Sequence, residues 1–112
     1  MSQGKQEGRV YAYSTADLIE RKTRGESFPM KIGTTTGDVP KRIKQQKTGN
    51  PDDLLQMYVS DPTPFAWFIE QSIHKQLRKE KKRYSTGGTE WFMCSLKRVG
   101  VLFKDFNDMA HA

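Results

Sequence analysis

Four short stretches of the chain are rich in apolar and aromatic residues and predict β-strands. They are residues 9–14, 28–35, 54–60 and 89–94. Successive side chains of a strand point to opposite faces, so Tyr11 and Tyr13 share one face of the first stretch. Val10 and Ala12 share the other face. The first strand is therefore predicted to carry its tyrosines on one side and its small apolar residues on the other.

The second stretch divides its side chains in the same way. Met30 and Ile32 share one face, and Lys31 and Gly33 share the other. An open glycine is thus predicted beside a lysine on one strand face. The first two strands can pair antiparallel.

The longest predicted helix starts in the segment Asp61-Pro62-Thr63-Pro64, in which a capping side chain precedes a proline of the first turn. Apolar residues then recur every four positions, and this spacing predicts a buried stripe on one helix face. The stripe consists of Phe65, Ile69, Ile73 and Leu77. We expect this helix to run to about Lys82.

Two shorter helical patterns lie on either side of the long one. Residues 34–38 supply N-cap chemistry for a helix with Val39 and Ile43 as its apolar positions, and Pro40 fits its first turn. Ser95 caps a final helix whose inward residues are Val99, Leu102, Phe103 and Phe106. One helical turn is predicted at 16–21, a turn at 50–53, and a basic, glycine-ended loop at 79–88.

The resulting order, β-β-α-β-α-β-α, predicts an α+β fold: a small single-domain sandwich with a central, mostly antiparallel sheet flanked by helices. We expect the domain to cover residues 8–112 and residues 1–7 to form a loose tail.

Composition narrows the classes of partner. The 112 residues include 19 Lys+Arg and 13 Asp+Glu, a net charge of +6 that favours a polyanion such as nucleic acid. The one cysteine, Cys94, excludes an intramolecular disulfide and a multi-cysteine zinc site. No apolar run approaches the roughly 20 residues that span a bilayer. We therefore expect no membrane partner and a reducing, cytoplasmic location, which is the host cytoplasm if the protein is encoded by a phage.

Several side chains are candidates for chemistry: Tyr11, Lys31 beside Gly33, Arg42, and Glu70 with His74. Each alone has an ordinary structural interpretation. Tyrosines in strands are usually packing residues, and Arg42 lies in a basic helix whose charges face solvent in most proteins. Glu70 and His74 are four residues apart, so they share a helix face as a surface pair or as part of a metal site.

The order and spacing of these residues resemble the GIY-YIG endonuclease superfamily, most closely its phage and fungal branch, the "meiotically up-regulated gene" type with K-I-G in the second motif. The similar segments are Gly8-Arg9-Val10-Tyr11, Lys31-Ile32-Gly33-Thr34-Thr35, Lys41-Arg42-Ile43, Glu70 to His74, and Glu90-Trp91-Phe92. Together they extend over about residues 8–94. Arg9-Val10 replaces the first glycine-isoleucine pair, and Lys31 replaces the tyrosine of the second motif.

The resemblance implies a metal-dependent endonuclease that hydrolyses phosphodiester bonds in DNA. Glu70 would then hold Mg²⁺ or Mn²⁺, since such cations are often bound through one carboxylate. Tyr11 would be the general base, helped by the charge of Lys31 because a phenol ordinarily has a pKa of about 10. Arg42 would clamp the scissile phosphate with its planar guanidinium. His74 would relay a proton or orient Glu70.

Basic residues on two segments are candidates for tracking the phosphate backbone of DNA or RNA. They are Lys41, Lys44 and Lys47 near the first predicted helix, and Lys79, Lys81, Lys82 and Arg83 in the basic loop. Trp67 and Trp91 fit core or rim positions better than base-stacking platforms. Glu90 most simply caps the closing strand. Recognition of a cleavage site would come from a partner protein.

Two alternatives remain open. The first is a catalytically inactive module that resembles the same superfamily and binds nucleic acid or another protein. The second is a phosphodiesterase acting on RNA or on a nucleotide signal, because the same chemistry requires only a phosphodiester. A domain of this size is typical of a phage or mobile-element product, or of a subunit of something larger.

Overall fold

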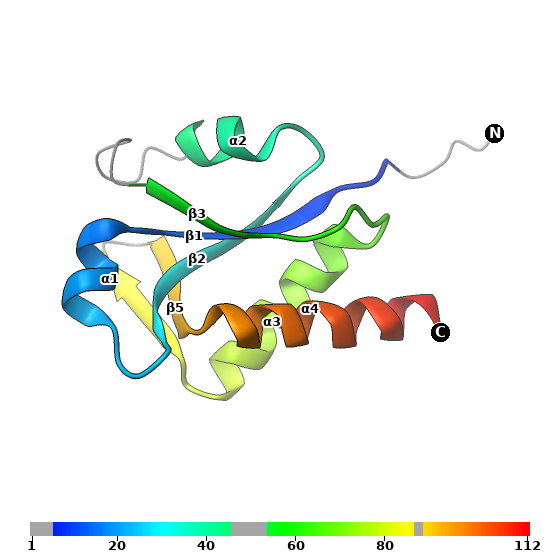
Figure 1. The fold of residues 1–112 in the computed structure, drawn as a ribbon. Helices are drawn as coiled ribbons and strands as arrows, with labels where there is room; N and C mark the ends of the chain where they lie inside the picture. The colour runs from blue at the N-terminus through cyan, green and yellow to red at the C-terminus, as the bar shows by residue number, and fades with distance from the viewer. Residues whose placement is uncertain (1–5, 46–53, 87–88) are drawn as a thin grey trace.

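A computed structural model describes residues 6–45, 54–86 and 89–112 and shows a five-stranded antiparallel sheet with the strand order β3-β1-β2-β5-β4 (Figure 1). The elements are β1 (Arg9–Thr15), α1 (Ala16–Lys22), β2 (Phe28–Thr35), α2 (Val39–Gln45), β3 (Leu54–Val59), α3 (Ala66–Lys79), β4 (Arg83–Thr86), β5 (Thr89–Cys94) and α4 (Leu96–His111). The predicted α+β sandwich with an antiparallel sheet is confirmed. Across the described ranges, none of the helices combines the length and the apolar character that crossing a membrane requires.

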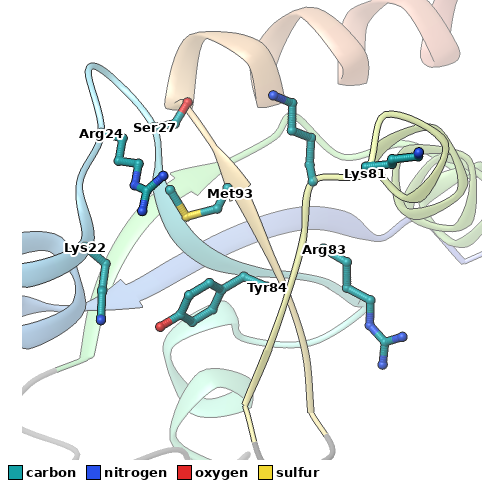
Figure 2. A pocket seen from close by; sticks show the side chains of 8 residues that line it. Lys22, Arg24, Ser27, Lys81, Arg83, Tyr84 and Met93 are labelled. Carbon is teal, nitrogen blue, oxygen red and sulfur yellow. The ribbon is translucent and has the colours of Figure 1, made fainter.

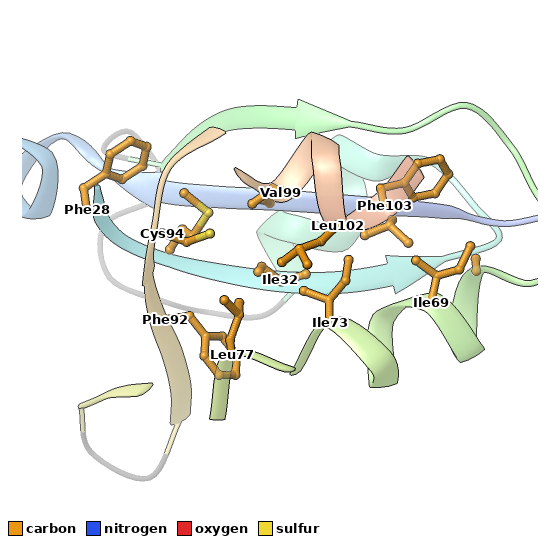
Figure 3. Close-up of a cluster of buried hydrophobic side chains, with 14 residues drawn as sticks. Phe28, Ile32, Ile69, Ile73, Leu77, Phe92, Cys94, Val99, Leu102 and Phe103 are labelled. Carbon is orange, nitrogen blue, oxygen red and sulfur yellow. The ribbon is translucent and has the colours of Figure 1, made fainter. Parts of the chain in front are cut away.

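Helices cover both faces of the sheet, with α2 on one side and α3 and α4 on the other (Figure 1). The α3/α4 side buries Val10, Ala12, Met30 and Ile32 with apolar residues of the two helices (Figure 3). The opposite side buries a second cluster that consists of Tyr11, Tyr13, Val39, Ile43 and Trp91. The predicted division of side chains between the faces of the first two strands is therefore confirmed.

The apolar stripe of α3 is confirmed, because Ile69, Ile73 and Leu77 are buried and Phe65 packs against the same core. Both predicted ends of this helix are wrong. The helix begins at Ala66. In the turn before it, Thr63 Oγ1 accepts a hydrogen bond of 3.2 Å from the Phe65 N–H. It ends at Lys79 rather than Lys82, because Lys81 has a left-handed backbone with φ 60° that turns the chain out of the helix.

The predicted basic loop at 79–88 is wrong for residues 83–86, which form the edge strand β4. Arg83 and Tyr84 lie opposite Phe92 and Trp91 of β5 in an antiparallel pair. Charged residues suit an edge strand, so a basic run does not exclude one. The predicted element order also omitted α1, which is a full helix capped by the Thr15 hydroxyl, and β3 ends at Val59 instead of residue 60. The turn predicted at 50–53 lies outside the described residues.

The central strands β2 and β5 separate partway along their length. Their pairing covers residues 28–30 of β2 and 92–94 of β5, whereas β2 stays paired with β1 along residues 31–35. Beyond Met30, the Ile32 carbonyl accepts a hydrogen bond of 2.8 Å from His74 Nε2 of α3. This separation brings side chains of β2 and α3 to a common opening.

Two hydrogen bonds between Arg78 and Glu90 tie α3 to β5 beside this opening. The Arg78 guanidinium donates them to the Glu90 carboxylate at 2.7 and 2.6 Å, and Arg83 Nε lies 3.6 Å from the same carboxylate. The bonds with Arg78 hold the pKa of Glu90 below its ordinary value of 4.5. Glu90 is thus a structural anion at the junction of helix and sheet.

We predict that Gly33→Ala destabilises the protein by about 1–3 kcal/mol, because an added methyl group overpacks a filled site. A Cβ at Gly33 would lie 2.5 Å from Tyr11 Oη and 2.7 Å from Cζ, and the Tyr11 ring is fully buried and stacked on Tyr13. Urea denaturation measures the change. Gly100→Ala is the control, since its Cβ would approach Tyr58 only to 3.8 Å in a helix that favours alanine. Equal stability of both variants would contradict the packing argument.

We predict that Glu90→Gln flattens the acid side of the stability profile. The pKa of Glu90 is depressed in the folded protein, so the unfolded chain binds more protons there and stability rises with pH. This contribution is complete above the ordinary value of 4.5 and is lost as the pH falls below it. Urea denaturation between pH 7 and pH 3 measures the effect. The control is Glu20→Gln, on the exposed surface of α1, which should show the same dependence of unfolding free energy on pH as wild type. A Glu90→Gln profile as steep as that of wild type would refute the role of the Arg78 contact.

Candidate active site

A cavity of about 530 Å³ opens where β2 and β5 separate, and all five predicted catalytic residues line it. They are Tyr11 of β1, Lys31 of β2, Arg42 of α2, and Glu70 and His74 of α3. Gly33, Trp67 and Glu90 line it as well. The predicted catalytic residues, which are up to 63 positions apart in sequence from Tyr11 to His74, therefore meet at one opening.

Tyr11 enters the site across the β1–β2 pair, where it lies directly opposite Gly33. The absence of a side chain at Gly33 leaves room for the phenol ring, which has no exposed surface. On its other side the ring stacks on Tyr13, with the centroids 6.1 Å apart and the planes at 30°. Tyr11 is thus held rigidly at the cavity wall, and its role as a general base stays a prediction.

Lys31 and Arg42 bring two positive charges to the same cavity. Burial, followed by the charge of Arg42, lowers the pKa of Lys31. Across the described residues, neither side chain has a carboxylate within ion-pair distance. Two neighbouring cations without a counter-charge repel each other, and an anion that binds between them relieves that repulsion. This part of the cavity therefore favours an anionic ligand.

His74 is oriented by the backbone of β2. Because a carbonyl oxygen only accepts hydrogen bonds, the Nε2 atom that contacts Ile32 must carry the proton. The ring also packs against Phe92, with the centroids 5.1 Å apart. Glu70 Oε2 lies 4.0 Å from His74 Nε2, too far for a hydrogen bond. The fixed ring places a polar group beside Glu70 without hydrogen-bonding its carboxylate, and the relay or orienting role predicted for His74 stays a prediction.

The Glu70 carboxylate fits a hard divalent cation bound through one protein ligand. It accepts one hydrogen bond, of 3.2 Å from the neutral Gln71 amide, and in the described part of the chain it has no lysine or arginine within ion-pair distance. Glu90, in contrast, is engaged by Arg78. Residues 6–45, 54–86 and 89–112 contain no group of three His, Cys, Asp or Glu side chains arranged to hold a metal. This donor set suits Mg²⁺ or Mn²⁺, whose remaining positions are filled by water and phosphate, and does not suit a zinc site.

The single cysteine does not take part in this site. Cys94 is buried in the α3/α4 core, and burial raises the pKa of its thiol to about 11. It is therefore a protonated thiol at neutral pH and a poor nucleophile.

The residues predicted to bind nucleic acid fall into two groups. Lys41 and Lys44 are exposed on α2 beside Arg42, whereas Lys79, Lys81, Lys82 and Arg83 lie between the end of α3 and the start of β4. Lys47 lies outside the described residues.

Trp67 is a functional candidate to which the sequence analysis assigned only a core or rim position. Trp91 is 2% exposed and belongs to the core, whereas Trp67 is 69% exposed on α3 and lines the cavity, which is a rim position. Residue 67 falls outside the stripe formed by positions 65, 69, 73 and 77, and this offset was the available signal. A large aromatic ring therefore lies at the rim of the candidate site.

Comparison with known families corrects the sequence-based identification. The model of the T5orf172 domain matches residues 8–107, a family different from GIY-YIG. The GIY-YIG identification is therefore wrong. It rested on five short motifs, whereas the T5orf172 match extends continuously from before β1 into α4. No curated protein and no solved structure matches the chain significantly. Because the family match covers most of its length, the chain belongs to the T5orf172 domain family.

Proposed function

We propose that this protein hydrolyses phosphodiester bonds in DNA and that the cavity between β2 and β5 is its active site. The observation that carries the proposal is the pair Lys31 and Arg42, two cations without a carboxylate partner in the described chain, facing the uncompensated carboxylate of Glu70. A phosphodiester accompanied by a divalent cation complements both charges. Membership of the T5orf172 domain family supports a nuclease-like or DNA-binding role, and so does the net charge of +6.

The cationic side chains bind and orient the phosphate. The planar guanidinium of Arg42 donates two hydrogen bonds to two phosphate oxygens, a geometry that a lysine ammonium does not match. Lys31 supplies a second positive charge from β2. Both charges stabilise the negative charge that develops on the phosphate as water attacks.

The Tyr11 oxygen accepts the proton of the attacking water as the new P–O bond forms. The bond to the leaving ester oxygen breaks, and that oxygen takes a proton from solvent. Lys31 and Arg42 line the same cavity as this phenol and supply the positive charge of that cavity. Mg²⁺ or Mn²⁺ held by Glu70 supplies further neutralisation of the phosphate charge when bound. His74 is a positioning residue, since its Nε2 proton is engaged by the Ile32 carbonyl.

Binding without hydrolysis is the second candidate function. It is favoured by the complete burial of Tyr11, because a general base must contact the water that it activates. In that case the same cations would hold a nucleic-acid backbone that the protein does not cleave.

We predict that purified protein nicks supercoiled plasmid in Mg²⁺ or Mn²⁺ and not in EDTA. Glu70→Gln and Arg42→Ala should each lower the cleavage rate by about 10²-fold or more, because the first removes the metal ligand and the second removes a positive charge that stabilises the transition state. Tyr11→Phe keeps the ring and removes only the hydroxyl, so it should lower the rate without loss of packing. The rate is measured by gel electrophoresis on variants whose circular dichroism matches wild type.

Matched controls for this experiment are Glu20→Gln and Arg21→Ala, which remove the same charges from the exposed face of α1. Both should cleave like wild type. Cleavage by the Glu70 and Arg42 variants at the wild-type rate would refute the assignment of the active site. Metal-independent DNA binding by a wild-type protein that never cleaves would establish the second candidate.

We predict that DNA bound in the presence of EDTA quenches the emission of Trp67. The ring is exposed at the cavity rim, so a bound base can stack on it, whereas Trp91 is buried. Fluorescence titration with a short single-stranded oligonucleotide measures the change, and Trp67→Phe should abolish it. Unchanged emission during binding that is detected by anisotropy of labelled DNA would show that the strand does not pass Trp67.

A further inference from the structure

A second cavity, of about 500 Å³, lies over β4 and β5 and shares no lining residue with the candidate active site (Figure 2). Five of its eight lining residues are cationic: Lys22 and Arg24 from the end of α1 and the following turn, and Lys81, Lys82 and Arg83 from the α3–β4 connection. None of the eight is acidic. Tyr84 and Met93 lie between the two groups of cations (Figure 2).

The charges around this cavity are only partly compensated, since Glu80 interacts electrostatically with Lys82. Arg83 approaches Glu90 at 3.6 Å, but in the described ranges the other four cations have no carboxylate within ion-pair distance. Two segments about 60 positions apart in sequence thus line one cavity with like charges on its two sides (Figure 2). A bound anion would offset the repulsion between these cations, so the cavity favours an anionic ligand.

Lys81 lies at the turn that leads from α3 into the wall of this cavity. It follows the end of α3 with φ 60°, and the Lys81 and Lys82 N–H groups close the helix on the Arg78 and Leu77 carbonyls. Glycine is the residue that this left-handed position favours. A lysine occupies it at a conformational cost and adds a positive charge to the cavity wall.

We propose that this basic cavity binds one nucleotide unit of a nucleic-acid strand outside the cleavage site, an inference that rests on the proposed function. The phosphate would contact Lys22, Arg24 and the cations of the α3–β4 connection. The ring of Tyr84, which is half-buried and lines the cavity, offers a surface on which the base or sugar packs. The cavity would therefore contribute to affinity for the strand and not to the chemical step.

The test is binding of a fluorescein-labelled oligonucleotide in EDTA at several salt concentrations. The double variant Lys22→Gln/Arg24→Gln should weaken binding at least about fivefold and reduce the slope of log Kd against log salt by about 1 for each phosphate that the variant no longer neutralises. Lys81→Asn should weaken binding as well, because asparagine accepts the left-handed backbone but carries no charge. The matched control, Lys75→Gln/Lys97→Gln, removes the same net charge from exposed positions of α3 and α4.

Binding by the Lys22/Arg24 variant that equals wild type or the matched control would overturn the proposal. Plasmid cleavage separates this result from failure of the active site: at saturating DNA, the Lys22/Arg24 variant should keep the wild-type rate, because the cavity serves binding alone. Loss of that rate with unchanged Kd would also overturn the proposal. If the wild type cleaves nothing and the variant still binds less tightly than the control, the proposed hydrolysis fails and the nucleotide site stands.

Chemical shifts of backbone amides distinguish a nucleic-acid strand from free phosphate as the ligand of this cavity. An oligonucleotide should shift signals of residues 22–27 and 81–84 together with those of the candidate active site. Shifts of residues 22–27 and 81–84 with inorganic phosphate alone, and none with the oligonucleotide, would overturn the assignment to a strand.

Discussion

The hydrogen bond from His74 Nε2 to the Ile32 carbonyl closes the side of β2 from which β5 has departed. An unpaired carbonyl at such a place would otherwise be a buried acceptor without a donor, which is costly. The bond satisfies it and fixes how α3 lies against the strand. Glu70, one helical turn before His74, is thereby placed within one cavity with Lys31 and Gly33 of β2. The site exists because the sheet is interrupted, and the interruption is stable because a helix side chain completes it.

Charge compensation differs between the two carboxylates of this cavity. Glu90 receives two hydrogen bonds from Arg78 and serves the junction of α3 and β5. Among polar groups of the described residues, Glu70 contacts a neutral amide and a histidine at 4.0 Å, and no lysine or arginine. On the other side, Lys31 and Arg42 face the cavity as cations that no described carboxylate neutralises. The protein thus separates a structural anion from residues whose charges are available to a ligand, and this separation is what makes the cavity a credible place for phosphate chemistry.

Local periodicity predicted most of the fold. The alternation in β1 and β2 assigned each residue from Val10 to Tyr13 and from Met30 to Gly33 to the correct face, and the four-residue stripe identified α3. It did not predict β4, because Arg83–Thr86 is polar and is a strand only through its pairing with β5.

The candidate site was only partly accessible from sequence. Five residues placed by motif do meet in one cavity, but the family inferred from those motifs was wrong, since short motifs cover little of a chain. The second cavity was predicted only in part, because Lys81, Lys82 and Arg83 were candidates for phosphate contact but their place beside Lys22 and Arg24 was not predicted. Lys22 and Arg24 come near Lys81 only through the long-range arrangement of α1, β2 and β5, and no local pattern encodes that arrangement.

The position of β4 at the edge of the sheet has a consequence for association between copies of this protein. An edge strand presents unpaired backbone groups onto which a strand of another molecule can add. β4 is only four residues long and begins with Arg83, directly after Lys81 and Lys82, so a second copy that approached this edge would bring its own positive charges against these. In the free protein, the charges of Lys81, Lys82 and Arg83 therefore disfavour aggregation in which a second copy extends the sheet at β4.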